Sequence, residues 1–213
     1  KTDLNEEIWE SMETFIEPQE NILEKLDEIL KDKQRNYIFG ASGCGKTTLA
    51  REYASYLKTK QDQSISVVFI RSGSLEDNIY ELKTRFLESR DDLFKKEDIL
   101  PLIQSKLKES NEKILFIFDD VKEEKNIKQI LEAIDLKHKI VITTKSSNIC
   151  NPEETFLKLD QFNKENYLEY LKKNQIDVND KNVGKFLEDN KFVLPIELEI
   201  LVKHLSAINW CFE

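Results

Sequence analysis

The stretch that decides the fold is glycine-rich and reads Gly40-Ala41-Ser42-Gly43-Cys44-Gly45-Lys46-Thr47-Thr48. From Gly40 to Thr47 it fits the pattern G-x-x-x-x-G-K-[ST], which is typical of loops that bind nucleotide phosphates. Glycines let a backbone curl its amide groups around phosphate oxygens, and the helix that follows directs its positive end at the same anion. The pattern therefore predicts a phosphate-binding loop, in which Lys46 neutralises β/γ-phosphate charge and Thr47 holds Mg²⁺.

A strand leads into this loop and a helix leaves it, as the motif requires. Further apolar runs predict more strands, and the segments between them show helical periodicity. The expected strands are 37–39, 67–70, 114–118, 140–143 and 155–159, and the expected helices include those around 75–86, 97–110 and 127–134, the first with Ser74 as its N-cap. Strands that alternate with helices indicate a parallel sheet with right-handed crossovers. We therefore expect an α/β fold of the P-loop NTPase type, ASCE or AAA+-like, with a sheet of five parallel strands.

Beyond Asp160 the strand pattern stops and only helical periodicity remains. We therefore expect two domains, a nucleotide-binding P-loop domain over residues 1–160 and a small helical domain over residues 161–213. Two helices are also expected ahead of the glycine loop, at 4–12 and 18–32. Because the chain starts on a lysine and ends in what looks like mid-element, we expect a fragment of a longer intracellular protein, whose regulatory region starts with the helical domain.

Composition narrows the class of partner. Hydrophobic residues make up 39% of the 213 positions, enough for a core, and the formal net charge is −9. An acidic chain lacks the basic surface that non-specific nucleic-acid binding needs, so a nucleic-acid partner is not expected. No apolar run approaches the ~20 residues of a membrane span, so no membrane partner is expected either. Cys44, Cys150 and Cys211 have no metal-ligand spacing, and an odd count fits a reducing compartment, which predicts a cytoplasmic location.

Two strand ends carry further candidate chemistry. The strand at 114–118 ends in Asp119-Asp120, and an acid at the tip of a buried strand suits a Mg²⁺ site beside a phosphate loop. Asp119 would support the metal and Asp120 would orient an attacking water. The strand at 140–143 is followed by Lys145, which could contact a γ-phosphate. A solvated acidic turn and an ordinary surface lysine are the alternative interpretations.

Taken together, these segments resemble the NB-ARC class of signal-transduction (STAND) ATPases, which includes apoptosome-forming adaptors and plant disease-resistance proteins. The matching segments are Gly45-Lys46-Thr47-Thr48-Leu49-Ala50, Phe118-Asp119-Asp120-Val121, Val141-Ile142-Thr143-Thr144-Lys145 and Phe192-Val193-Leu194-Pro195-Ile196-Glu197-Leu198. The last is similar to the family motif G-L-P-L-A-L, whose proline packs on the bound nucleotide. The resemblance implies an ATP/ADP site with Mg²⁺, in which Thr47 and Asp119 hold the metal and Asp120 and Lys145 act on the γ-phosphate side. The expected nucleotide contacts are Phe15, Ile16, Gly40, Ser42, Gly43, Cys44, Gly45, Lys46, Thr47, Thr48 and Pro195.

The chain departs from the family pattern at three places. Residues 15–20 stand where the family carries a G-R-[DE] signature, and adenine contacts are assigned to Phe15 and Ile16 by position alone. Lys145 replaces an arginine, which exchanges a bidentate fork for a point charge. Phe192 and Val193 replace glycines before the proline. No winged-helix segment is recognised in the chain.

The resemblance implies a switch between ATP-bound and ADP-bound states, with slow ATPase activity, that controls oligomeric assembly in cell-death or immune signalling. It further implies a homo-oligomer in the full-length protein and protein effectors as partners. Three alternatives stay open: an AAA+-like replication-initiator or remodelling ATPase, a small-molecule kinase, and a module that holds ADP permanently. The first two classes normally place arginines in a late lid, and no arginine follows Arg90 in this chain.

Overall fold

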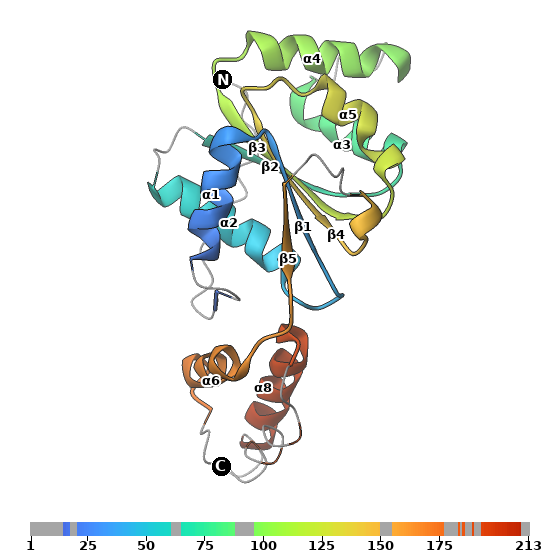
Figure 1. Ribbon diagram of the computed structural model, residues 1–213. Coiled ribbons are helices and arrows are strands. Elements are labelled where there is room, and N and C mark those ends of the chain that lie inside the picture. Colours follow the sequence, from blue (N-terminus) through green and yellow to red (C-terminus); the bar gives the residue numbers. More distant parts are fainter. Residues whose placement is uncertain are drawn as a thin grey trace.

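The computed structural model describes residues 15–17, 21–60, 65–87, 96–149, 155–176 and 193–209, with the single positions 183, 185 and 189. Five strands in the order β2-β3-β4-β1-β5 form one sheet, and every pair of neighbours is parallel (Figure 1). The strands are β1 (Arg35–Gly40), β2 (Ile65–Arg71), β3 (Lys113–Val121), β4 (Lys139–Thr144) and β5 (Thr155–Leu159). The sheet confirms the predicted α/β fold of the P-loop NTPase type, with β4 as the added strand between β1 and β3.

One described helix precedes the first strand, and the others connect the strands or follow the last one. Their bounds are α1 (Ile22–Asp32), α2 (Lys46–Lys60), α3 (Leu75–Phe86), α4 (Ile99–Glu109), α5 (Lys128–Ala133), α6 (Lys164–Lys173) and α8 (Pro195–Asn209). Ser74 caps α3 as predicted, in a reciprocal box with Asp77. The predicted helix 4–12 lies outside the described residues, and the predicted helix 18–32 is described from residue 21 onward.

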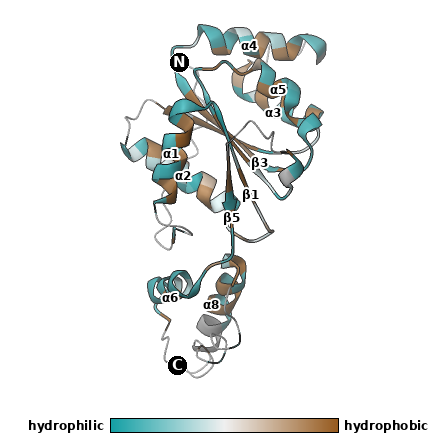
Figure 2. Ribbon diagram, viewed as in Figure 1, coloured by the Kyte–Doolittle hydropathy of each residue, from teal (hydrophilic) through white to brown (hydrophobic). Residues whose placement is uncertain are grey.

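The two faces of the sheet are covered by different helices. Phe116 and Phe118 of β3 pack with α3, α4 and α5, whereas Leu115 and Ile117 point to the other face and pack with α1 and α2. Strands buried on both faces read as continuous apolar runs, which is why β3 could be recognised from its sequence. Figure 2 shows the central strands as a hydrophobic layer between helices of mixed character. None of the helices in the described ranges combines the length and the hydropathy that a bilayer crossing requires.

Helices α6 and α8 lie beyond the end of β5 and share a small core of their own (Figure 1). This core consists of Ile16, Phe162, Tyr167, Val193 and Leu198. Phe162 and Val193 form an antiparallel bridge with N···O distances of 2.8 and 3.2 Å, which ties the start of α6 to the start of α8.

A short segment at residues 15–17 contacts both the sheet with its covering helices and the pair of helices α6 and α8. Phe15 packs against the α1/α2 side of the sheet, and Ile16 belongs to the core of α6 and α8. Lys173 Nζ donates a hydrogen bond to the Phe15 carbonyl at 2.8 Å, and Asn166 Nδ2 donates one to the Glu17 carbonyl at 3.2 Å. The segment therefore joins the sheet to the two helices independently of the chain that leaves β5.

Candidate nucleotide-binding site

A cavity of about 780 Å³ opens at the carboxyl ends of the strands, between the glycine loop and α8. This is the edge at which parallel α/β sheets bind their ligands. Every predicted site residue except Gly40 lines this cavity: Phe15, Ile16, Ser42, Gly43, Cys44, Gly45, Lys46, Thr47, Thr48, Asp119, Asp120, Lys145 and Pro195. Gly40 lies beneath it, because a Cβ at this position would come within 2.5 Å of the Leu159 carbonyl oxygen. Its part is therefore to let β1 and β5 pack under the loop.

The glycine loop turns through two left-handed residues. Gly43 has φ +80° and Gly45 has φ +91°, conformations that side-chain-bearing residues rarely adopt. The Leu49 amide then donates to the Gly45 carbonyl at 2.8 Å as α2 begins at Lys46. The loop thus delivers the amino end of a fifteen-residue helix to the cavity, with the dipole direction that favours an anion.

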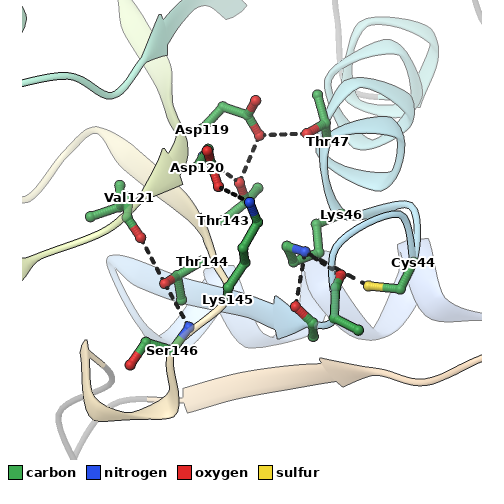
Figure 3. Close-up of polar contacts among 12 residues, drawn as sticks. Cys44, Lys46, Thr47, Asp119, Asp120, Val121, Thr143, Thr144, Lys145 and Ser146 are labelled. Atoms are coloured by element: carbon green, nitrogen blue, oxygen red, sulfur yellow. Dashed lines mark hydrogen bonds and ion pairs between the residues drawn. The ribbon is translucent and has the colours of Figure 1, made fainter.

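Lys46 folds back over the loop (Figure 3). Its ammonium donates to the carbonyl oxygens of Gly40 at 2.9 Å and Ala41 at 2.7 Å, and it lies 3.9 Å from Cys44 Sγ. The side chain is only 7% exposed, so the contacts hold a buried cation at the floor of the cavity. Burial raises the pKa of the Cys44 thiol in spite of the neighbouring ammonium. Cys44 is therefore a neutral packing residue rather than a thiolate.

The two predicted metal residues are in direct contact. Thr47 Oγ1 donates to Asp119 Oδ1 at 2.7 Å, and Thr143 Oγ1 donates to the same oxygen at 2.6 Å (Figure 3). Asp119 is 3% exposed, and hydrogen bonds to a carboxylate are about twice as strong as neutral ones. The carboxylate is consequently fixed over the start of α2, where it could serve as a hard oxygen ligand for a divalent cation.

Asp120 points in a different direction from its neighbour because the strand bulges at this point. The β3–β4 register shifts between Phe118 and Val121, and Asp120 has φ +56°. Its amide donates to Thr143 Oγ1 at 2.9 Å, and its carboxylate lies 3.4 Å from Lys145 Nζ. A left-handed aspartate costs of order 1 kcal/mol and is a feature that clusters at functional sites. The bulge thus aims one acid at Thr47 and the next at Lys145.

The opposite wall comes from the start of α8. The Ile196 amide donates to the Gly43 carbonyl at 3.3 Å, and a Cβ on Gly43 would come within 2.4 Å of Ile196 Cγ2. Pro195 occupies the first helical position, where its missing N–H costs nothing, and it lines the cavity beside Gly45. The glycine loop and the helical part, which consists of α6 and α8, therefore meet directly at the cavity.

Several lining residues were not predicted from the sequence. They are Leu49, Arg71, Thr143, Phe162, Tyr170, Asn174, Ile196, Glu199, Val202 and Lys203. Arg71 ends β2 and Thr143 is the last residue but one of β4, so the rule that parallel strands present their carboxyl ends to the ligand could have identified both. The residues of α6 and α8 carry no local signal of this kind. The pKa of Tyr170 is raised by burial and by the nearby Glu199.

In the described part of the chain, no three His, Cys, Asp or Glu side chains gather into a metal-binding group. A site with one carboxylate and one hydroxyl fits Mg²⁺, which retains waters and takes further oxygens from substrate phosphates. The donor set of Thr47 and Asp119 is therefore chemically suited to the metal that the sequence predicts.

Comparisons with known proteins support a nucleotide-binding fold of this kind. The model of the NB-ARC domain family matches residues 16–181. A comparison with curated proteins yields no match.

Solved structures share the fold at low identity. The Orc1 protein of Aeropyrum pernix, solved in complex with DNA, has a TM-score of 0.69 and 12% identity over 93% of this chain and 61% of its own. A STAND protein with a tetratricopeptide repeat sensor from Pyrococcus horikoshii has a TM-score of 0.58 and 20% identity, over 91% of this chain and 30% of its own. AMPPCP-bound DnaA from Aquifex aeolicus has a TM-score of 0.60 and 18% identity, over 90% of this chain and 62% of its own.

At these identities the structural likeness shows the fold, and the family model shows the family. The chain spans 61%, 30% and 62% of these three proteins, so it corresponds to a part of each. The match to the family model covers most of the chain. The chain therefore belongs to the NB-ARC family of P-loop ATPases.

Proposed function

We propose that this chain is an adenine-nucleotide switch that binds ATP or ADP with Mg²⁺ in the cavity and hydrolyses ATP slowly. The observation that carries the proposal is the contact between the start of α8 and the glycine loop, through Ile196 and Gly43. A phosphate group held by the loop would lie against both the sheet and the helical part. Nucleotide state could then bias how the two parts pack.

The phosphate end of the nucleotide is assigned to the loop. Loop amides from Ser42 to Thr48 and the buried Lys46 ammonium would hold the phosphate oxygens. Thr47 and Asp119 would hold Mg²⁺, which when bound neutralises charge on the β- and γ-phosphates. The base is assigned to the end of the cavity where Phe15 and Ile16 lie, with Pro195 closing on the nucleotide from α8.

Discrimination between ATP and ADP is assigned to the pair of Lys145 and Asp120. Their separation of 3.4 Å and the exposure of both side chains make this a weak ion pair, worth at most about 1 kcal/mol. A γ-phosphate could therefore take over Lys145 at little cost. Releasing Lys145 would leave Asp120 to orient a water, and the short side chain of Asp120 favours slow hydrolysis.

The wider role follows from family resemblance. We propose that residues 161–213 act as a mobile helical domain in a longer cytoplasmic protein. Exchange of ADP for ATP would control assembly of a homo-oligomer that engages protein effectors in cell-death or immune signalling.

A replication-initiator-like ATPase is the second candidate. The likeness to Orc1 and DnaA favours it, since these two structures match 93% and 90% of this chain. The net charge of −9 disfavours a DNA-binding face within this chain. Mobility-shift titration with duplex DNA at low salt separates the two: binding with ATP present would support the initiator class and contradict the switch proposed here.

The nucleotide proposal is tested by equilibrium binding of labelled ATP, ADP and GTP to the purified chain and to Lys46→Ala. Lys122→Ala is the matched control, because Lys122 is an exposed lysine just after β3 and does not line the cavity. We expect the wild type and the control to bind ATP and ADP equally well and the Lys46 variant to lose most binding. Equal binding by all three proteins, or binding by none, contradicts the site; preference for GTP contradicts the adenine assignment. Mass spectrometry of nucleotide released before and after incubation with labelled ATP distinguishes exchange from permanently trapped ADP.

A further inference from the structure

The end of β2 places an arginine beside the acidic strand. Arg71 is the last residue of β2 and stands in register with Asp119 on the neighbouring β3. The Ser72 amide donates to the Asp119 carbonyl at 2.8 Å, so the pairing continues to the tip of the strand. Neighbouring strands lie about 4.8 Å apart, which brings the two backbones into immediate contact. The position of Arg71 is therefore fixed by the sheet rather than left to a loop.

Alternation along the strand determines which face Arg71 occupies. Phe69, two residues earlier, stands in register with Ile117, which packs on the α1/α2 side of the sheet. The Arg51 guanidinium of α2 lies over the Phe69 ring at 5.2 Å. Because side chains two apart on a strand share a face, Arg71 emerges on the α2 side, where Thr47 and Asp119 meet. It lines the same cavity as these residues.

Arg71 differs from the other cations that line the cavity in having no partner within the described part of the chain. Lys46 is bonded to loop carbonyls, Lys145 lies against Asp120, and Lys203 donates to Glu199 at 2.6 Å. Arg71 makes no such hydrogen bond or ion pair with a described residue, and its side chain is exposed to the cavity. An unpaired guanidinium at the phosphate end of the cavity is a ready site for an anionic group.

We propose that Arg71 binds the γ-phosphate of ATP from the β2 side of the cavity and thereby favours ATP over ADP. This inference rests on the proposed function, since it assumes that the glycine loop holds the nucleotide. A guanidinium presents several donors in a planar fork that suits phosphate oxygens, and ADP offers no group at the γ-position. Arg71 would supply, from within the sheet, the arginine that the chain lacks after Arg90.

The test compares Arg71→Gln and Arg71→Lys with the wild type in parallel titrations of Mg·ATP and Mg·ADP. Arg51→Gln is the control, because Arg51 is an arginine on the same side of the sheet that does not line the cavity. We expect Arg71→Gln to weaken ATP binding about tenfold or more and to leave ADP binding within about twofold, as expected for loss of a charged hydrogen bond. Arg71→Lys should show a smaller loss for ATP, and Arg51→Gln should leave the ATP/ADP ratio unchanged.

Unchanged ATP binding by Arg71→Gln, or equal losses for ATP and ADP, overturns the inference and leaves the proposed function intact. Absence of nucleotide binding by the wild type overturns both. Melting temperatures of all variants check folding, and Arg71→Lys decides the question if the glutamine variant does not fold. The inference is also overturned if Arg51→Gln loses as much ATP binding as Arg71→Gln does. The loss of ATP binding would then follow from removing any positive charge rather than from removing Arg71.

Discussion

Thr143 holds the two neighbouring acids through one hydroxyl group, and removing that group is the sharpest perturbation of the site. The hydroxyl donates to Asp119 at 2.6 Å and accepts from the Asp120 amide at 2.9 Å, in a side chain that is 1% exposed. Thr143→Val keeps the branched shape that suits a strand but leaves both partners without this contact. At about 1–3 kcal/mol for each unsatisfied group, we expect the free energy of unfolding to fall by about 2–4 kcal/mol.

Thr144→Val is a matched control in the next position. Thr144 is 0% exposed and also makes two hydrogen bonds, donating to the Val121 carbonyl at 2.8 Å and accepting from the Ser146 amide at 3.1 Å. Its partners are backbone groups outside the acidic pair. The two variants should therefore lose similar stability by urea unfolding, while only one of them disturbs the candidate metal ligand.

The functional readout is the affinity for ATP with Mg²⁺ and with EDTA. Loss of a group that orients a metal ligand typically costs 10–100-fold in metal affinity, so Thr143→Val should reduce the gain in ATP affinity that Mg²⁺ provides by about tenfold or more. Thr144→Val should retain that gain, and Thr143→Ser should restore it. An equal loss in both valine variants, or a stability change below about 0.5 kcal/mol for Thr143→Val, would refute the reasoning.

Three further predictions concern the loop, the ion pair and a buried histidine. Gly43→Ala should lower the melting temperature, because its φ is +80° and the new Cβ would meet Ile196 Cγ2 at 2.4 Å; adding Ile196→Ala should recover only part of the loss, since the backbone strain remains. Lys145→Ala should weaken ATP binding more than ADP binding in the same titrations and change stability by less than about 1 kcal/mol, because its ion pair is exposed; equal effects on the two nucleotides would contradict its assignment. Burial lowers the pKa of His138, whose Nδ1 accepts from the Ile114 amide at 3.2 Å, so the unfolded chain binds more protons than the folded one below about pH 6.5 and stability should fall as the pH falls through this value. Urea unfolding at pH 7.5 and 5.5 should show a smaller pH dependence for His138→Asn, and parallel curves for the two proteins would rule out this contribution.

Local sequence signals were sufficient to predict the glycine loop and most strands of the sheet. The glycine loop is recognisable because its backbone conformation requires specific residues at fixed spacing, and β3 is recognisable because burial on both faces demands an unbroken apolar run. The prediction of β3 nevertheless ended at Phe118, whereas the strand continues to Val121. Two aspartates in succession gave no sign that a left-handed residue and a register shift would keep the strand paired.

Contacts between segments that lie far apart in the sequence could not be predicted from these local signals. The double role of Thr143 depends on the register of β4 against β3, which no local pattern records. The wall formed by Tyr170 and Lys203 depends on how α6 and α8 pack against the sheet. The sequence indicated Lys145 as the cation on the γ-phosphate side, whereas the sheet also brings Arg71 to the cavity from the end of β2.

The segment at residues 15–17 has a mechanical consequence. Because Phe15 packs with the sheet and Ile16 with the core of α6 and α8, two segments of the described chain link these helices to the sheet, this one and the chain that leaves β5 at Leu159, in addition to the contact of Ile196 with Gly43 at the cavity. A body attached at two places turns about the line that joins them. When the contact between Ile196 and Gly43 opens and these two linking segments hold, the helices have a single axis of rotation. Breaking the contact at Ile16 as well would leave the chain after β5 as the remaining link. A given displacement at Pro195 would then no longer correspond to one orientation of α8.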